Sequence, residues 1–152
     1  MNYNVVELNE KIIVGKSVRT SNKNLQSTKD IGAMWQRFLE EQIYDKIDNK
    51  VTGKGIGLYT NYEGDAGKPY TFVCGVEVFE STNRDMETYI IPKGQYAKFS
   101  IKGHMVTAVA DAWQRIWKMP LDRAYKCDFE VYHRDSENMD QQSIDIYISL
   151  LP

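Results

Sequence analysis

The chain has 152 residues, of which 42% are hydrophobic, 26% are charged and 12% are aromatic, including ten tyrosines. This length fits one ordinary domain, and these proportions are typical of a folded globular protein and exclude a disordered one. The formal net charge of −2 provides no basic field for phosphates, so direct binding to nucleic acid is not expected.

The beginning of the chain carries no targeting pattern. Residues 1–8 lack the basic start and apolar core of a secretory signal, and no apolar run has membrane-spanning length, so we expect a cytoplasmic protein. Cys74 and Cys127 lie in apolar, strand-like runs without C-x-x-C spacing, which indicates buried thiols in a reducing compartment. His104 and His133 are far apart and have no neighbouring cysteine, so neither a metal site nor another cofactor is predicted.

A helix is the clearest element of the first part of the chain. Apolar residues recur with three-four spacing over residues 31–47, and Gly53 comes after this pattern ends. Ser27 with Asp30 resembles a capping box, which places the helix start near Ser27. The predicted elements are, in order, a strand at 12–19, this helix, and strands at 56–62 and 70–79 separated by the turn-rich residues 63–69.

The second part of the chain has the same order of elements. A helix is predicted over residues 105–118, with an apolar face and with Pro120 as its stop. The predicted elements are a strand at 96–101, this helix, and strands at 126–133 and 143–150 joined by the polar residues 134–142.

Short stretches of the two parts also correspond in sequence. Residues 34–38 match residues 112–116 around a shared Trp-Gln-Arg, and residues 57–59 match residues 130–132. Glu77 is expected to fall opposite Asp145. An internal duplication of strand-helix-strand-strand units follows, in an α+β fold. We predict a single domain over 1–152, with halves at about 1–80 and 86–152 and a connection at residues 80–86.

Polar residues alternate with apolar ones along the last two predicted strands, so each strand has one polar side. Matching positions of the first half add further acids and rings, including Phe79, and two indoles one helical turn apart provide a wall. We therefore expect one sheet face to hold carboxylates and aromatic rings. The candidate ligand-binding residues are Glu130, Tyr132, Asp145, Tyr147, Tyr59, Glu77, Trp113 and Trp117.

Three interpretations of this face are open. Antiparallel sheets often turn an acidic, tyrosine-rich side to water without any function. The face is alternatively the floor of a cleft, where a carboxylate among rings attracts organic cations by Coulomb and cation–π interactions. In the third interpretation Glu130 is a general base with Tyr132 or Tyr147 as proton donor, as in a hydrolase. Trp35 is expected to pack in the core.

Three motifs resemble one known family. They are Gly-Val-Glu-Val at 75–78, Phe-Glu-Val-Tyr at 129–132 and Asp-Ile-Tyr-Ile at 145–148, and together they resemble the GyrI-like, or AraC-type, effector-binding domain, particularly its free-standing bacterial members. The resemblance covers essentially the whole chain. It implies a pseudo-twofold antiparallel sheet with helices packed on it and a central cleft between the halves.

The resemblance also implies roles for individual residues. In relatives fused to regulators of multidrug response, a buried glutamate of the F-E-V-Y strand neutralises cationic drugs, which corresponds to Glu130. The acid and tyrosine of the last strand correspond to Asp145 and Tyr147, where aspartate has a shorter reach than the commoner glutamate.

The function expected on these grounds is binding of a hydrophobic or cationic small molecule, by a component of transcription regulation that lacks a DNA-binding segment of its own. A separate DNA-binding regulator or DNA gyrase is the expected protein partner. The alternatives are a gyrase- or protein-interaction module and an enzyme, because some family members hydrolyse cyclopropane-containing toxins. In the enzymatic alternative the catalytic residues are Glu130 and Tyr132.

Overall fold

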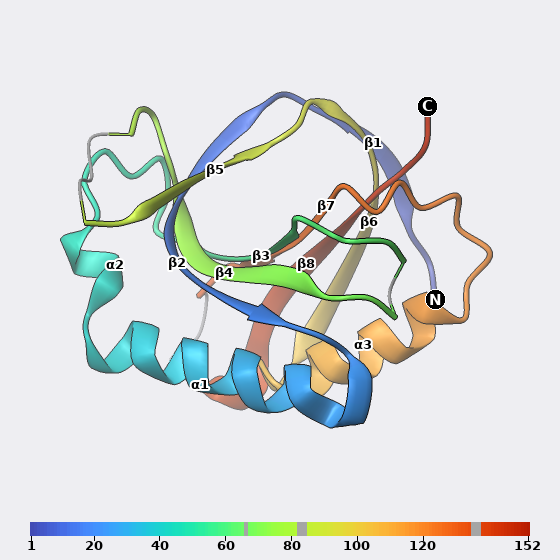
Figure 1. Ribbon diagram of the computed structural model, residues 1–152, viewed down its shortest axis with the longest axis horizontal. Coiled ribbons are helices and arrows are strands. Elements are labelled where there is room, and N and C mark those ends of the chain that lie inside the picture. The colour runs from blue at the N-terminus through green and yellow to red at the C-terminus, as the bar shows by residue number, and fades with distance from the viewer. Residues whose placement is uncertain (66, 82–84, 135–137) are drawn as a thin grey trace.

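The computed structural model describes residues 1–65, 67–81, 85–134 and 138–152. Within these residues, eight strands form one antiparallel sheet whose edge strands arch over one of its faces (Figure 1). Two helices, α1 (Gln26–Glu40) and α3 (Thr107–Trp117), cover the opposite face. The expected α+β fold, with helices packed on an antiparallel sheet, is therefore confirmed.

Both halves of the chain contain the predicted order of elements, and each also begins with a strand that was not predicted. Each unpredicted strand has only five residues, most of them exposed. Neither strand therefore has the alternation of buried and exposed residues that would predict it. In chain order the elements are β1 (Asn4–Leu8), β2 (Lys11–Thr20), α1, α2 (Ile43–Lys46), β3 (Gly55–Thr60), β4 (Tyr70–Val78), β5 (Glu87–Ile91), β6 (Gly94–Gly103), α3, β7 (Cys127–Tyr132) and β8 (Gln142–Ser149), with 3-10 turns at Lys23–Leu25 and Met139–Gln141.

The strand order shows the duplication and an exchange of edges. The order is β1-β6-β8-β7-β3-β4-β2-β5, so that β3, β4 and β2 on one side of the centre correspond to β7, β8 and β6 on the other. The edge strands cross over: β1 of the first half pairs with β6, and β5 of the second half pairs with β2. Each half therefore completes the sheet of the other.

Strand register places the pseudo-twofold axis at one residue pair. Gly57 of β3 lies opposite Glu130 of β7, and these are the residues that the sequence match of 57–59 with 130–132 makes equivalent. On the outer side of this central strand pair, Gly57 lies opposite Cys74 of β4, and Glu130 lies opposite Ile146 of β8. Cys74 is thus the counterpart of Ile146, and Glu77, three residues on, corresponds to Ser149. The predicted match of Glu77 with Asp145 was wrong.

Helix α1 begins at Gln26, close to the predicted start at Ser27, but its cap and its end differ from the prediction. Its N-cap is Leu25, whose φ is 59°, and no side chain caps the helix. Asp30 instead accepts hydrogen bonds from Oγ1 of Thr20 and Nε2 of Gln26, so the capping box was wrong. Gln42 has a φ of 51° and separates α1 from α2, so the apolar pattern continues through two helices.

A pair of glycines allows the sheet to curl strongly. Gly15 of β2 lies directly opposite Gly75 of β4. A Cβ atom at Gly15 would lie 2.0 Å from the carbonyl oxygen of Cys74, and one at Gly75 would lie 2.3 Å from that of Val14. The two strands approach so closely here that no side chain fits, which lets β2 bend over the sheet.

Parts of the predicted connections lie outside the described residues. These are residue 66 of the predicted turn, residues 82–84 of the predicted connection between the halves, and residues 135–137 of the polar stretch before β8. The division of a single domain into halves at 1–80 and 86–152 stays a prediction. Across the described ranges, none of the helices combines the length and the apolar character needed to cross a bilayer.

Candidate functional site

Glu130 lies in the middle of β7 and has no exposed surface. Its Oε2 accepts hydrogen bonds from the hydroxyl of Tyr59, at 2.7 Å, and from the indole Nε1 of Trp113, at 2.6 Å. Its Oε1 accepts one from the hydroxyl of Tyr132, at 2.7 Å. Among the described residues these donors are all neutral, so this buried carboxylate has no cationic partner.

The space that the carboxylate occupies exists because residue 57 is a glycine. A Cβ atom on Gly57 would lie 2.8 Å from Oε1 of Glu130 and 3.3 Å from the ring of Phe72. Across the pseudo-twofold axis, one half thus supplies the acid and the other supplies the room for it.

The aromatic groups around Glu130 are arranged in symmetric pairs. Tyr59 and Tyr132 occupy equivalent positions and bind different oxygens of the carboxylate. Trp113 of α3 packs on Tyr59, and its counterpart Trp35 of α1 packs on Tyr132, each with ring centroids 5.0 Å apart. Of these two indoles only Trp113 donates to the carboxylate. These aromatic rings enclose Glu130, so the expected cleft is not open at this carboxylate.

Burial determines the protonation of this cluster. It raises the pKa of Glu130, because desolvation disfavours the charged carboxylate, while the three hydrogen bonds act in the opposite direction. Burial and the neighbouring carboxylate raise the pKa values of Tyr59 and Tyr132 well above their ordinary value, so both tyrosines remain donors at neutral pH. A buried carboxylate without a counter-ion is energetically unfavourable and attracts a cation.

A second buried carboxylate lies on the same side of β7. Asp128 accepts hydrogen bonds from Nη2 of Arg123, at 2.8 Å, and from the hydroxyl of Tyr62, at 2.6 Å. Its other oxygen accepts the backbone N–H of Ser149. Unlike Glu130, Asp128 is therefore paired with a cation.

The structure separates the candidate residues onto two faces of the sheet. Directly opposite residues of an antiparallel pair share a face, and Glu130 lies opposite Ile146 while Phe129 lies opposite Tyr147. Asp145 and Tyr147 are thus one residue out of step with Glu130 and point to the other face. The expectation that they share its face was wrong.

The residues on the other face have different surroundings. The ring of Tyr147 stacks on Phe129, with centroids 4.5 Å apart. Asp145 accepts a hydrogen bond from Ser100 and contacts Nε2 of His133, both at 2.7 Å. Glu77 also lies on this face, because it pairs with Ile13, and it forms an ion pair with Lys11 at 3.6 Å.

Trp117 and Phe79 lie outside the Glu130 cluster. Trp117 is 47% exposed, with its ring 6.4 Å from that of Trp113, and Phe79 is 71% exposed. Sequence reasoning missed Arg123, which comes from an irregular segment where periodicity gives no signal. It also missed Tyr62, which was predicted as the last residue of a strand but lies just beyond the end of β3. Gly57 could have been recognised as part of the site from its sequence match with Glu130, because a glycine opposite an acidic residue leaves space for the acidic side chain.

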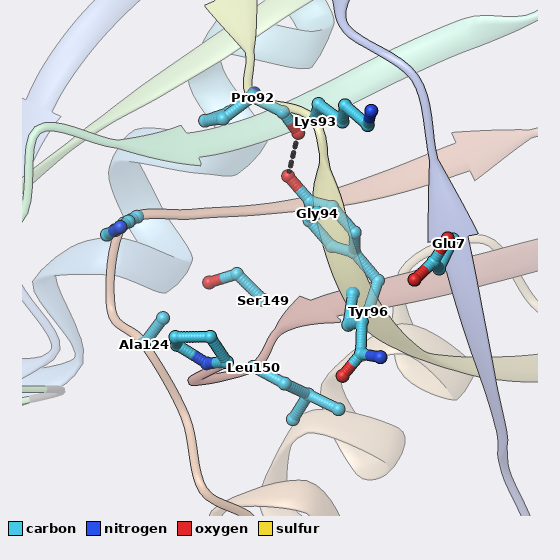
Figure 2. A pocket seen from close by; sticks show the side chains of 11 residues that line it. Glu7, Pro92, Lys93, Gly94, Tyr96, Ala124, Ser149 and Leu150 are labelled. Atoms are coloured by element: carbon cyan, nitrogen blue, oxygen red, sulfur yellow. Dashed lines mark hydrogen bonds between the residues drawn. The ribbon is translucent and has the colours of Figure 1, made fainter.

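A hollow of about 410 Å³ lies between β1, the β5–β6 turn and the C-terminal residues (Figure 2). At its wall the hydroxyl of Tyr96 donates to the carbonyl of Pro92 (Figure 2). None of the predicted site residues lines this hollow. In the described parts of the chain, no cluster of three or more His, Cys, Asp or Glu side chains is arranged to hold a metal ion.

The chain matches a known family over nearly its whole length. The model of the family described as "Cass2: Integron-associated effector binding protein" matches residues 4–150. The chain belongs to the Cass2 family. This confirms the resemblance to GyrI-like effector-binding proteins. One relative is the "Putative transcriptional regulator protein YobU" of Bacillus subtilis (strain 168), which is 28% identical over an alignment of 155 positions that covers 96% of each chain.

Solved structures share the fold of this Cass2 protein. An integron cassette protein from the mobile metagenome of Vibrio cholerae is 28% identical, with a TM-score of 0.75 over 98% of this chain and 95% of that one. SAV2435, whose structure was solved with bound tetraphenylphosphonium, is 18% identical, with a TM-score of 0.81 over 97% of this chain and 93% of the other. At that identity the likeness to SAV2435 is one of fold.

Proposed function

We propose that this Cass2 protein binds hydrophobic organic cations and that Glu130 neutralises their charge. The observation that carries the proposal is a fully buried carboxylate held by three neutral donors, without a cationic partner among the described residues. A lipophilic cation supplies the missing charge and stacks on aromatic rings, whose faces attract cations. The tetraphenylphosphonium bound by SAV2435, a protein of the same fold, supports this ligand class.

The proposal assigns the contacts to the helix-covered face of the sheet. Tyr59, Tyr132 and Trp113 surround the carboxylate, and Trp35 closes the cluster on the side of α1. Because Glu130 has no exposed surface, a ligand reaches it only when these rings move apart. Asp145, Tyr147 and Glu77 lie on the opposite face, so we assign them no contact with a ligand at Glu130.

The test replaces the carboxylate and keeps its shape. Glu130→Gln should remain folded, because the amide oxygen can accept from Tyr59 and Trp113 while the amide nitrogen donates to Tyr132. It should weaken tetraphenylphosphonium binding by about 1–3 kcal/mol, measured by calorimetry or tryptophan quenching. The matched control is Asp145→Asn, which removes a carboxylate from the opposite face and should leave affinity unchanged. Equal affinity of the wild type and Glu130→Gln would refute the assignment of Glu130 as the group that neutralises the ligand's charge.

A hydrolase is the second candidate, favoured by the 2.7 Å hydrogen bond that joins Tyr132 to Glu130 and by the raised pKa of this carboxylate. The cluster must open for either activity, but general-base hydrolysis needs both a substrate and a water molecule at the carboxylate, whose two oxygens already accept hydrogen bonds from Tyr59, Trp113 and Tyr132. Binding is therefore the better-supported proposal. A turnover assay with reactive cyclic compounds separates the two, because a catalyst continues beyond stoichiometric conversion and a binding protein does not.

A part in transcription regulation rests on the name of the relative YobU. We propose that ligand capture by this chain is detected by a separate DNA-binding protein, because a net charge of −2 does not favour binding to DNA phosphates. A pull-down with and without tetraphenylphosphonium, followed by identification of any DNA-binding protein retained, tests this partner. Gyrase as a partner stays a prediction.

A further inference from the structure

Two buried carboxylates lie next to each other on the covered face of the sheet. Asp128 and Glu130 are both fully buried, and they are two residues apart on β7, so both side chains point toward the helices. Alternate residues of a strand are roughly 7 Å apart. A ligand charge placed at one of these carboxylates therefore lies within Coulomb range of the other.

Of these two carboxylates, only Asp128 has a cationic partner among the residues that the structure describes. Nη2 of Arg123 lies 2.8 Å from its Oδ2, and the side chains of this pair are 7% and 0% exposed. The guanidinium is held in place by the rings of Tyr125, at 4.3 Å, and of Trp113, at 5.8 Å. Trp113 is also one of the three donors to Glu130, so the same indole contacts both the guanidinium and the unpaired carboxylate.

The charges of this cluster add up to one negative charge. Glu130 and Asp128 carry two negative charges when ionised, and Arg123, which stays protonated in proteins, carries one positive charge. We propose that Arg123 restricts the ligand to a single positive charge. This inference rests on the proposed function and adds a property of the ligand to it.

A dication meets two obstacles in such a site. Its first charge is neutralised by Glu130, but the second has no free anion, because Asp128 is already paired. The second charge would also lie near the guanidinium of Arg123, and repulsion between like charges is strong where water is excluded. A monovalent cation of the same shape meets neither obstacle.

The experiment compares two ligands of one shape and different charge. N-methyl-4-phenylpyridinium carries one positive charge and methyl viologen carries two on a nearly identical ring skeleton. The readout is the ratio of the dissociation constant of methyl viologen to that of N-methyl-4-phenylpyridinium. In the wild type this ratio should be well above one, and in Arg123→Gln, which leaves Asp128 without a cation, it should fall at least about tenfold.

Two control variants separate this effect from general damage. The double variant Arg123→Gln/Asp128→Asn restores the single negative charge and should keep the wild-type ratio. Lys98→Gln removes a positive charge near Asp145 on the opposite face and should also keep it. If Arg123→Gln does not fold, Asp128→Asn replaces it: its unpaired guanidinium should weaken N-methyl-4-phenylpyridinium binding at least about tenfold, and the double variant should restore it.

The outcomes distinguish the inference from the function on which it rests. Three results overturn the role of Arg123 and leave cation binding intact. The wild type binds both ligands equally, or a folded Arg123→Gln keeps the wild-type ratio of dissociation constants. In the third, the double variant departs from the wild-type ratio or, in the alternative with Asp128→Asn, fails to restore affinity. Unchanged affinity in Glu130→Gln, or no binding of any cation by the wild type, overturns both.

Discussion

Glu130 occupies a position where an apolar residue would stabilise the fold more. The carboxylate is buried in an aromatic cluster, and three neutral hydrogen bonds compensate only part of its lost hydration. Burial consequently raises its pKa. A group that lowers stability and is still held by three converging donors fits a binding site better than a structural role.

The raised pKa gives a stability prediction with a definite sign. The folded protein holds the Glu130 proton more tightly than the unfolded chain does, so this contribution to stability is fully present below the unfolded pKa and is lost as the pH rises through the folded pKa. At pH 8 we expect the free energy of unfolding of Glu130→Gln to exceed that of the wild type by about 1–3 kcal/mol.

Urea unfolding at several pH values measures this difference. It should shrink as the pH falls toward the range in which free glutamate is protonated, because the wild-type side chain then becomes neutral as well. A variant that is less stable than the wild type at every pH would show that the hydrogen bonds to the ionised carboxylate outweigh its desolvation.

At the scale of the elements, the central strand pair β3–β7 determines the site. Gly57 faces Glu130 across this pair, and the helices α1 and α3 place matching indoles over it. The acid is accommodated because the strand from the other half has no side chain at that point.

We expect Gly57→Ala to disturb this pair. The added Cβ would lie 2.8 Å from Oε1 of Glu130, so the carboxylate must move and loses hydrogen-bond geometry. A stability loss of about 1–3 kcal/mol and weaker tetraphenylphosphonium binding should follow, measured by urea unfolding and calorimetry. Gly32→Ala is the matched control: it adds the same methyl group in α1, where nothing lies within 4 Å, and should stabilise the helix by up to about 1 kcal/mol. Wild-type stability and affinity in Gly57→Ala would contradict the packing argument.

At the scale of the whole molecule, the exchanged edge strands tie the two halves together. β1 belongs to the first half and pairs with the second, while β5 does the reverse. Neither half has its complete sheet without the other, and the sheet centre is itself a pair of strands from both halves. This arrangement supports the prediction that the chain is one domain.

The single-domain prediction implies that both halves unfold together. Trp35 reports on the first half and Trp113 on the second, so two variants isolate their signals: Trp113→Phe/Trp117→Phe and Trp35→Phe/Trp117→Phe. Within each variant, tryptophan fluorescence and far-UV circular dichroism should give coincident urea transitions. Separate transitions for the two signals would show that the halves are independent units.

The sequence by itself determined the elements with a strong period and the residue at the centre of the site. Both long helices and the six longer strands follow from spacing, and the match of residues 57–59 with 130–132 located the axis. The tertiary structure decided which polar sides face each other, because alternation defines two sides of a strand while a shift of one residue exchanges them. Asp145 and Tyr147 are on the far face for this reason. The edge exchange depends on long-range contacts, for which a local pattern in the chain carries no signal. Arg123 and Asp128 are only five residues apart, but their pairing depends on the course of the irregular segment before β7, which follows no period.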